Sequence, residues 1–199
     1  MTVDTVSIIS ANKLRLTELY SLQNYGIESY KLDSIKMTVV HYTVIPTLKQ
    51  TFDLFLKDSL ASNRSYIRDF NVLNVGIHYV IDREGSIYNL LPDSVMARHV
   101  IGFNHISLGI ENIARDSSEL TYDQLVSNAR LINFLKFRYP EMEFLIGHNE
   151  YNNKNLPHFS LFKSLNHNYK PYDKPDPGRR FMSDLRQILK DQYDLEFLE

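Results

Sequence analysis

The sequence predicts a single α/β domain in which helices flank a mixed central β-sheet. Its 199 residues suffice for one substantial hydrophobic core. Hydrophobic residues make up 43% of the chain and charged residues 23%, fractions that are ordinary for a packed globular protein. Short apolar runs rich in β-branched residues alternate with segments whose apolar residues recur at helical spacing. These observations favour one domain of mixed helix and strand.

The first half of the chain predicts a strand, a helix and a hairpin. Residues 35–43 are rich in β-branched and aromatic side chains, which is typical of a buried strand. Apolar residues at helical spacing predict a helix over 48–60. The apolar runs 74–82 and 86–91 are separated by a short turn that contains Gly85, so they are expected to pair as a hairpin.

The second half continues the alternation with a strand at 106–113. Thr121 and Gln124 form a capping box that opens a long helix, which Pro140 ends. A short buried strand, a loop and a final helix are expected at 143–147, 149–177 and 181–195.

The N-terminal residues 1–34 give a weaker pattern, with a helix expected only over 14–22. We interpret 1–34 as an extension packed on the domain and 35–199 as the domain itself. No internal repeat or low-complexity linker divides the chain further.

Composition excludes several classes of partner. Twenty-two Lys and Arg residues against 24 Asp and Glu give a formal charge of -2, so we expect no nucleic acid partner. No apolar stretch approaches the length of a membrane span. The chain has no cysteine, so a metal would have to bind His, Asp or Glu. The sequence indicates no oligomeric state.

The first residues carry no export signal as they stand, because Asp4 occupies a position where a signal peptide has positive charge. The sequence leaves the location open: the cell envelope or periplasm is expected if a signal peptide was removed, and the cytoplasm otherwise.

Two histidines lie at or just beyond the ends of predicted strands. His41 lies near the end of the first strand, and His148 directly follows the short strand at 143–147, so both side chains could emerge at one edge of the sheet. Catalytic zinc sites are often built in this way. Asp176, held between two prolines, is the best third ligand. The alternatives are two ordinary hydrogen-bonded histidines and an aspartate that only caps a turn.

Five motifs in order resemble those of the zinc-dependent N-acetylmuramoyl-L-alanine amidases, a family that shares its fold with phage amidases and peptidoglycan recognition proteins. They are Val40-His41-Tyr42-Thr43, the segment 75–88 from Val75-Gly76-Ile77-His78, Ser107-Leu108-Gly109-Ile110-Glu111, Ile146-Gly147-His148, and Lys174-Pro175-Asp176-Pro177-Gly178 with Phe181. The resemblance covers residues 38–181.

The resemblance implies that His41, His148 and Asp176 bind zinc and that Glu111 and Lys174 act on the substrate. Glu111 would move the proton of the attacking water and Lys174 would hold negative charge on the carbonyl oxygen. An alternative is that these two side chains only pair with each other across a groove.

Further residues are assigned by position within the resemblance. His99 is expected either to contact substrate or to support a metal ligand, and Asn104 is a second groove candidate. His78 is expected to be structural or supporting. His105, His158 and His167 stand in polar contexts and are expected to be solvated, although His158 could replace Asp176 as a ligand.

The chain departs from compact relatives by a longer segment between His148 and Asp176. We interpret residues 152–173 as a mobile flap or wall beside the zinc, because Asn and Lys alternate in it with apolar residues. The alternative is a surface loop that packs away from the groove.

The implied reaction is hydrolysis of the amide between N-acetylmuramic acid and L-alanine in peptidoglycan or muropeptides. Two alternatives remain open at this point. One is a peptidoglycan-binding module without catalysis, and the other is a zinc hydrolase that cuts another amide of the stem peptide.

Overall fold

Six strands form one mixed sheet in the order β1-β4-β3-β5-β2-β6. The computed structural model describes residues 1–32 and 34–198. Strands β3, β5, β2 and β6 run parallel, β4 is antiparallel to β3, and β1 is parallel to β4. The strands are β1 (Val3–Thr5), β2 (Met37–Tyr42), β3 (Tyr79–Ile81), β4 (Ile87–Asn89), β5 (Ser107–Asn112) and β6 (Phe144–Gly147).

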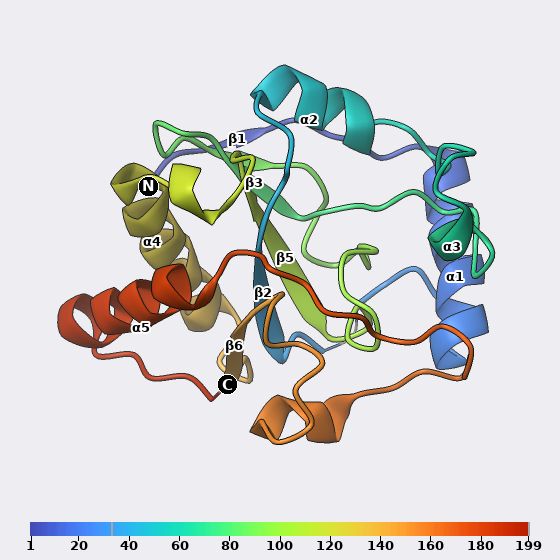
Figure 1. The fold of residues 1–199 in the computed structure, drawn as a ribbon. Coiled ribbons are helices and arrows are strands. Elements are labelled where there is room, and N and C mark those ends of the chain that lie inside the picture. The colour runs from blue at the N-terminus through green and yellow to red at the C-terminus, as the bar shows by residue number, and fades with distance from the viewer. Residues whose placement is uncertain (33, 199) are drawn as a thin grey trace.

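Helices flank the strands on both sides, with α4 and α5 to the left and α1 to the right in Figure 1. The helices are α1 (Ala11–Tyr25), α2 (Leu48–Phe55), α3 (Ser65–Arg68), α4 (Tyr122–Arg138) and α5 (Arg179–Tyr193), with short 3₁₀ turns at Ser117–Glu119 and Pro157–Leu161. The expected mixed sheet flanked by helices is therefore confirmed.

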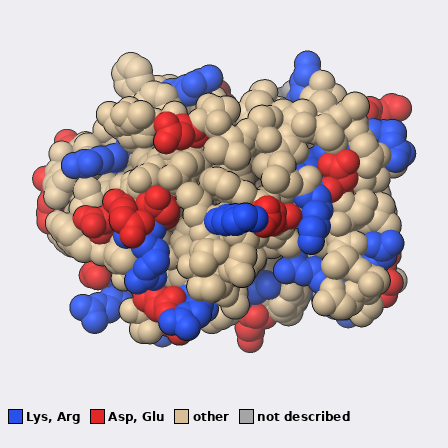
Figure 2. Space-filling model, turned by 90° about the horizontal axis from the view of Figure 1, so that it is seen from above, with Lys and Arg blue, Asp and Glu red and all other residues tan. Residues whose placement is uncertain are grey.

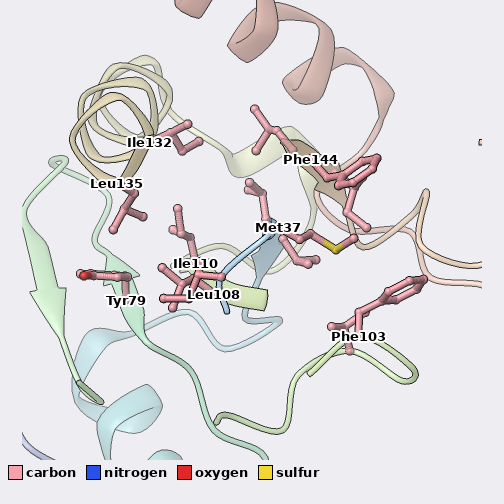
Figure 3. Packing of buried hydrophobic residues seen from close by; sticks show 14 of the residues in the cluster. Met37, Tyr79, Phe103, Leu108, Ile110, Ile132, Leu135 and Phe144 are labelled. Atoms are coloured by element: carbon pink, nitrogen blue, oxygen red, sulfur yellow. The ribbon is translucent and has the colours of Figure 1, made fainter. Parts of the chain in front are cut away.

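The central strands are buried along their length, as strands covered on both faces must be. Every residue of β2 is buried. Figure 3 shows Ile132 and Leu135 of α4 directed toward the strand residues Leu108 and Ile110. This packing fixes the strands whose ends carry the site.

The N-terminal segment shares the main core. β1 adds an edge strand to the sheet, and α1 buries Leu16, Tyr20 and Tyr25 in the same cluster as the central strands. α1 is longer than the expected 14–22, because Ser10 caps its start and Gly26, with a φ of 68°, ends it. The boundary between residues 34 and 35 stays a prediction.

Two elements are shorter than the sequence predicted. Helix α2 ends at Phe55, where the expected helix ran to residue 60, because the Asn74 side chain binds the carbonyl oxygens of Leu54 and Lys57 instead. The hairpin strands β3 and β4 hold three residues each. Gly85 has a φ of 83° in their turn, as expected.

The surface carries no extended patch of one charge on the face shown in Figure 2, where Lys and Arg are interspersed with Asp and Glu. Among the described residues, no helix is long and apolar enough to cross a membrane.

The expected capping box at the start of α4 is present. The hydroxyl of Thr121 accepts a hydrogen bond from the Gln124 backbone, and the Gln124 side chain accepts one from the Thr121 backbone. We expect Thr121→Ala to lower the free energy of unfolding by about 1 kcal/mol, because an orphan amide at the helix start loses its partner. Urea denaturation measures this change. Thr121→Ser is the matched control, and equal losses in both variants would contradict a capping role.

Candidate metal centre

Four functional candidates meet at the carboxyl ends of the parallel strands. His41 is the fifth residue of β2 and lies opposite Glu111 of β5 in the strand register. His148 directly follows β6, which pairs with the other side of β2. Asp176 comes from the segment that leads into α5. In open α/β sheets, ligands bind outside the carboxyl ends of the strands, and the site obeys this rule.

Three side chains form a close triangle of ligand atoms. His41 Nδ1 lies 3.0 Å from His148 Nδ1 and 3.1 Å from Asp176 Oδ2, and His148 Nδ1 lies 3.0 Å from the same oxygen. Their exposed fractions are 2% for His41, 8% for His148 and 7% for Asp176. Within the described parts of the chain, these three residues form the group of side chains that could hold a metal ion.

The triangle fits a zinc ion by chemistry and by size. Two imidazole nitrogens and one carboxylate oxygen are a donor set of catalytic zinc sites, which keep a fourth position open. Tetrahedral bonds of about 2.0–2.2 Å require donor atoms roughly 3.3 Å apart, close to the observed edges. The three residues therefore have the chemistry and spacing of a zinc site.

The protonation states also suit a metal. Burial, and after it the neighbouring His41, lower the pKa of His148 to about 4. Burial alone would raise the pKa of Asp176, but hydrogen bonds from His148 and His41 outweigh it and hold that pKa below its usual value. Neutral imidazole and ionised carboxylate are the forms that bind metals.

His99 contacts His41, one of the three residues of the triangle. His99 Nδ1 lies 3.1 Å from His41 Nε2, and His99 Nε2 lies 3.3 Å from the Ser107 hydroxyl. If His41 binds metal through Nδ1, its Nε2–H donates to His99 and fixes the ring orientation. The structure thus shows the supporting contact that was one of the two alternatives for His99. Its contact with substrate stays a prediction.

Asn104 supports the loop that carries His99. Its side-chain oxygen accepts hydrogen bonds from the backbone of His99 and Val100, and its amide nitrogen donates to the Tyr20 hydroxyl. Asn104 is only 1% exposed, so these internal contacts account for it. The expected contact of Asn104 with substrate stays a prediction.

Glu111 has one buried carboxylate oxygen, Oε2, that finds no hydrogen-bond partner among the residues that the structure describes. Burial raises the pKa of Glu111 well above its usual value, the nearby Asp176 raises it further, and Lys174 opposes the shift. No ion pair between Glu111 and Lys174 is found among residues 1–32 and 34–198, so the structure does not show the alternative in which they only pair. The Lys174 ammonium instead lies 4.2 Å from the centre of the Tyr172 ring.

Comparison with known proteins decides the family. The family model described as N-acetylmuramoyl-L-alanine amidase matches residues 31–178. The chain belongs to this amidase family. No curated protein sequence matches the chain.

Two solved structures with TM-scores of 0.55 and 0.50 show the same fold at low identity. A selenomethionine derivative of AmpD has 23% identity and a TM-score of 0.55, with 79% of this chain and 86% of that chain covered. The endolysin amidase LysCS from Clostridium intestinale URNW has 18% identity and a TM-score of 0.50, covering 78% and 86%. A peptidoglycan recognition protein-LE in complex with tracheal cytotoxin has 22% identity and a TM-score of 0.46, covering 64% and 78%.

A groove in this amidase-family chain runs past the triangle. Two adjoining hollows of about 190 and 110 Å³ share His99, His148 and Lys174 in their lining. Glu111 and Asp176 line the larger hollow, and Tyr169 and Tyr172 line the smaller one.

The segment 152–173 thus forms part of the groove wall. Arg98 anchors it by donating to the Tyr169 hydroxyl at 3.1 Å, and the Tyr169 ring stacks on Phe70. These contacts support the expected wall over the alternative of a loop packed away from the groove. The expected mobility of the segment stays a prediction.

Two histidines expected to be solvated are buried or packed. His158 is fully buried, with its ring edge-on to Phe103, and it lies outside the ligand triangle. His105 stacks on Tyr25, and burial lowers its pKa to about 4. The expectation was wrong for both because aromatic residues distant in sequence cover them. His167 is exposed, as expected.

Sequence reasoning missed Ser107 and Tyr172. Ser107 opens the motif that ends at Glu111, yet only the folded chain shows that its hydroxyl meets His99. Tyr172 was counted among the apolar residues of the long segment, and no spacing marked its contact with Lys174.

His78 is structural, in agreement with expectation. The His78 ring accepts a hydrogen bond from the Gly109 backbone at Nδ1 and donates from Nε2 to the Val95 carbonyl oxygen. Burial lowers the pKa of His78 from 6.5 to about 4. Protonation of Nδ1 would break this arrangement, because a protonated Nδ1 cannot accept the hydrogen bond from the Gly109 backbone.

This geometry gives a pH dependence of stability. Between pH 6.5 and 4 the unfolded chain binds a proton at His78 that the folded chain does not, so stability falls as the pH drops through this window. The free energy of unfolding of the parent chain should fall between pH 7 and pH 4. We expect this fall to be smaller in His78→Gln, by up to roughly 3 kcal/mol. Urea denaturation at both pH values tests this, with the exposed His167→Gln as the matched control. Equal losses in His78→Gln and the parent chain would contradict the account.

Proposed function

We propose that this chain is a zinc-dependent N-acetylmuramoyl-L-alanine amidase. It hydrolyses the amide between the lactyl group of N-acetylmuramic acid and the L-alanine of the stem peptide. The observation that carries the proposal is a His–His–Asp donor triangle with a buried, partly unpaired carboxylate beside it, in a chain of this family. Where in the cell the reaction takes place stays a prediction from the sequence.

His41, His148 and Asp176 would hold one zinc ion per chain. A zinc ion held by these residues would supply Lewis-acid chemistry, which polarises a carbonyl group and lowers the pKa of bound water toward about 7. His99 and Ser107 keep the His41 ring in the orientation that directs Nδ1 to the site.

Glu111 moves the proton. Burial raises the pKa of its carboxyl group, and a carboxyl group with a raised pKa is suited both to accept a proton from the attacking water and to return one to the leaving amine. Oε2 has no hydrogen-bond partner among residues 1–32 and 34–198, so no contact within that part of the chain competes with such a transfer.

Lys174 stabilises the charge that develops on the carbonyl oxygen. Its ammonium lines the groove and forms no ion pair within the described part of the chain, so no carboxylate there competes with the substrate for its N–H groups. A positioned cation in a partly dehydrated groove acts on the transition state more strongly than it would in water.

The substrate is peptidoglycan or a fragment of it. The groove beside the triangle has tyrosine rings on one wall and charged groups near its centre, which suits a ligand with both sugar rings and a charged peptide. A binding module without catalysis would need neither the donor triangle nor an unpaired Glu111.

Four variants test this assignment. We expect Glu111→Gln to lower kcat by about 10²-fold to 10⁴-fold and Lys174→Met by about 10²-fold to 10³-fold, because each removes a group that acts in the transition state. Both should keep their zinc. Asp176→Ala should lose the zinc itself, and the exposed His167→Ala is the control.

Zinc content, melting temperature and release of new amino termini from peptidoglycan are measured on the same preparations. Full activity after chelation and dialysis, or a Glu111→Gln variant as active as the parent chain, would contradict the proposal. Loss of stability without loss of kcat would show that Glu111 and Lys174 are structural.

A further inference from the structure

The proposed catalytic lysine is held by an aromatic ring. The Nζ atom of Lys174 lies 4.2 Å from the centroid of the Tyr172 ring, within the range of a cation–π contact. No carboxylate within residues 1–32 and 34–198 forms an ion pair with Lys174. The ring is therefore the contact that restrains the ammonium.

The Tyr172 backbone is itself fixed by Tyr151. The Tyr151 hydroxyl accepts a hydrogen bond from the Tyr172 backbone nitrogen at 2.8 Å and donates one to the Tyr172 carbonyl oxygen at 2.7 Å. Asn152 adds a bond of 2.8 Å to the side chain of Asp173. The pair 151–152, shortly after His148, thus clamps the pair 172–173, directly before Lys174.

This clamp is connected to the ligand triangle. Tyr151 is fully buried, and its ring lies 4.8 Å from the His148 ring, centroid to centroid. Contacts therefore run from His148 through Tyr151 and Tyr172 to Lys174. The relative position of His148 and the ammonium is set by packed side chains and not by the flexible lysine alone.

We propose that Tyr172 is a positioning residue for the reaction, holding the Lys174 ammonium beside the groove through its ring face. The inference rests on the proposed function, in which Lys174 acts on the carbonyl oxygen. A carboxylate in the place of the Tyr172 ring would offset the positive charge of the Lys174 ammonium and accept hydrogen bonds from its N–H groups. A ring attracts the cation while leaving its charge and its N–H groups for the substrate.

The long segment between His148 and Asp176 thereby gains a role in catalysis. It supplies Tyr172, and it returns the chain to Tyr151 so that the ring is fixed. A lysine side chain has many rotamers, so an ammonium held in advance needs less ordering when the transition state forms.

The test compares two variants of Tyr172, one that removes the aromatic ring and one that keeps it. We expect Tyr172→Leu to lower kcat by about 3-fold to 30-fold at nearly constant KM and zinc content, because the cation–π contact is lost. Tyr172→Phe keeps the ring and should retain most of the turnover. Tyr122→Leu, an exposed tyrosine at the start of α4, is the matched control.

The decisive arm repeats Tyr172→Leu in a Lys174→Met background. If Tyr172 acts through Lys174, the second substitution costs nothing further there. An equal loss in both backgrounds would show that the ring contacts substrate directly, and it would overturn the inference.

Failure of this inference is distinguishable from failure of the proposed function. Unchanged kcat in Tyr172→Leu, together with a large loss in Lys174→Met, rejects only the positioning role. Unchanged kcat in Lys174→Met rejects the catalytic assignment of the lysine on which the inference rests.

Discussion

The site depends on the parallel pairing of β2 with β5 on one side and β6 on the other. This pairing places His41 opposite Glu111 and Val40 opposite Gly147, so that His148 emerges one residue beyond β6. Successive side chains of a strand point to opposite faces, and a slip of one residue would carry His41 away from its partners. The burial of the apolar side chains of these strands specifies the register, so the hydrophobic core and the site are consequences of the same pairing.

Burial then sets the chemistry of the assembled groups. The same loss of water keeps His148 neutral and raises the pKa of Glu111, while hydrogen bonds from two histidines keep Asp176 ionised. The pKa values of two carboxyl groups in one groove are thus shifted in opposite directions. Asp176 is suited to holding a cation and Glu111 to carrying a proton. Such a separation of pKa values between neighbouring carboxyl groups is how one site can assign distinct roles to similar side chains.

Much of this arrangement was predictable from local sequence, and the rest depends on distant contacts. Patterns within a few residues predict the strands and the α4 capping box. They also predict that His41 lies near the end of one strand and that His148 directly follows another. The helix α1 was only partly predictable, because its buried face includes the polar residues Lys13, Thr17, Ser21 and Asn24, which hide the helical period. The burial of His158 by Phe103 and the clamp of Tyr151 on Tyr172 join residues that no local pattern connects.

The central claim is that this groove hydrolyses one particular amide with the help of a metal. Mass spectrometry of peptidoglycan digested with the zinc-loaded chain tests it most directly, because it identifies the bond that is cut. The account predicts glycan fragments that end in a free lactyl carboxyl group and peptides that begin with a free L-alanine amino group, and neither product after chelation. Cleavage at another amide of the stem peptide, or the same products from metal-free protein, would contradict it.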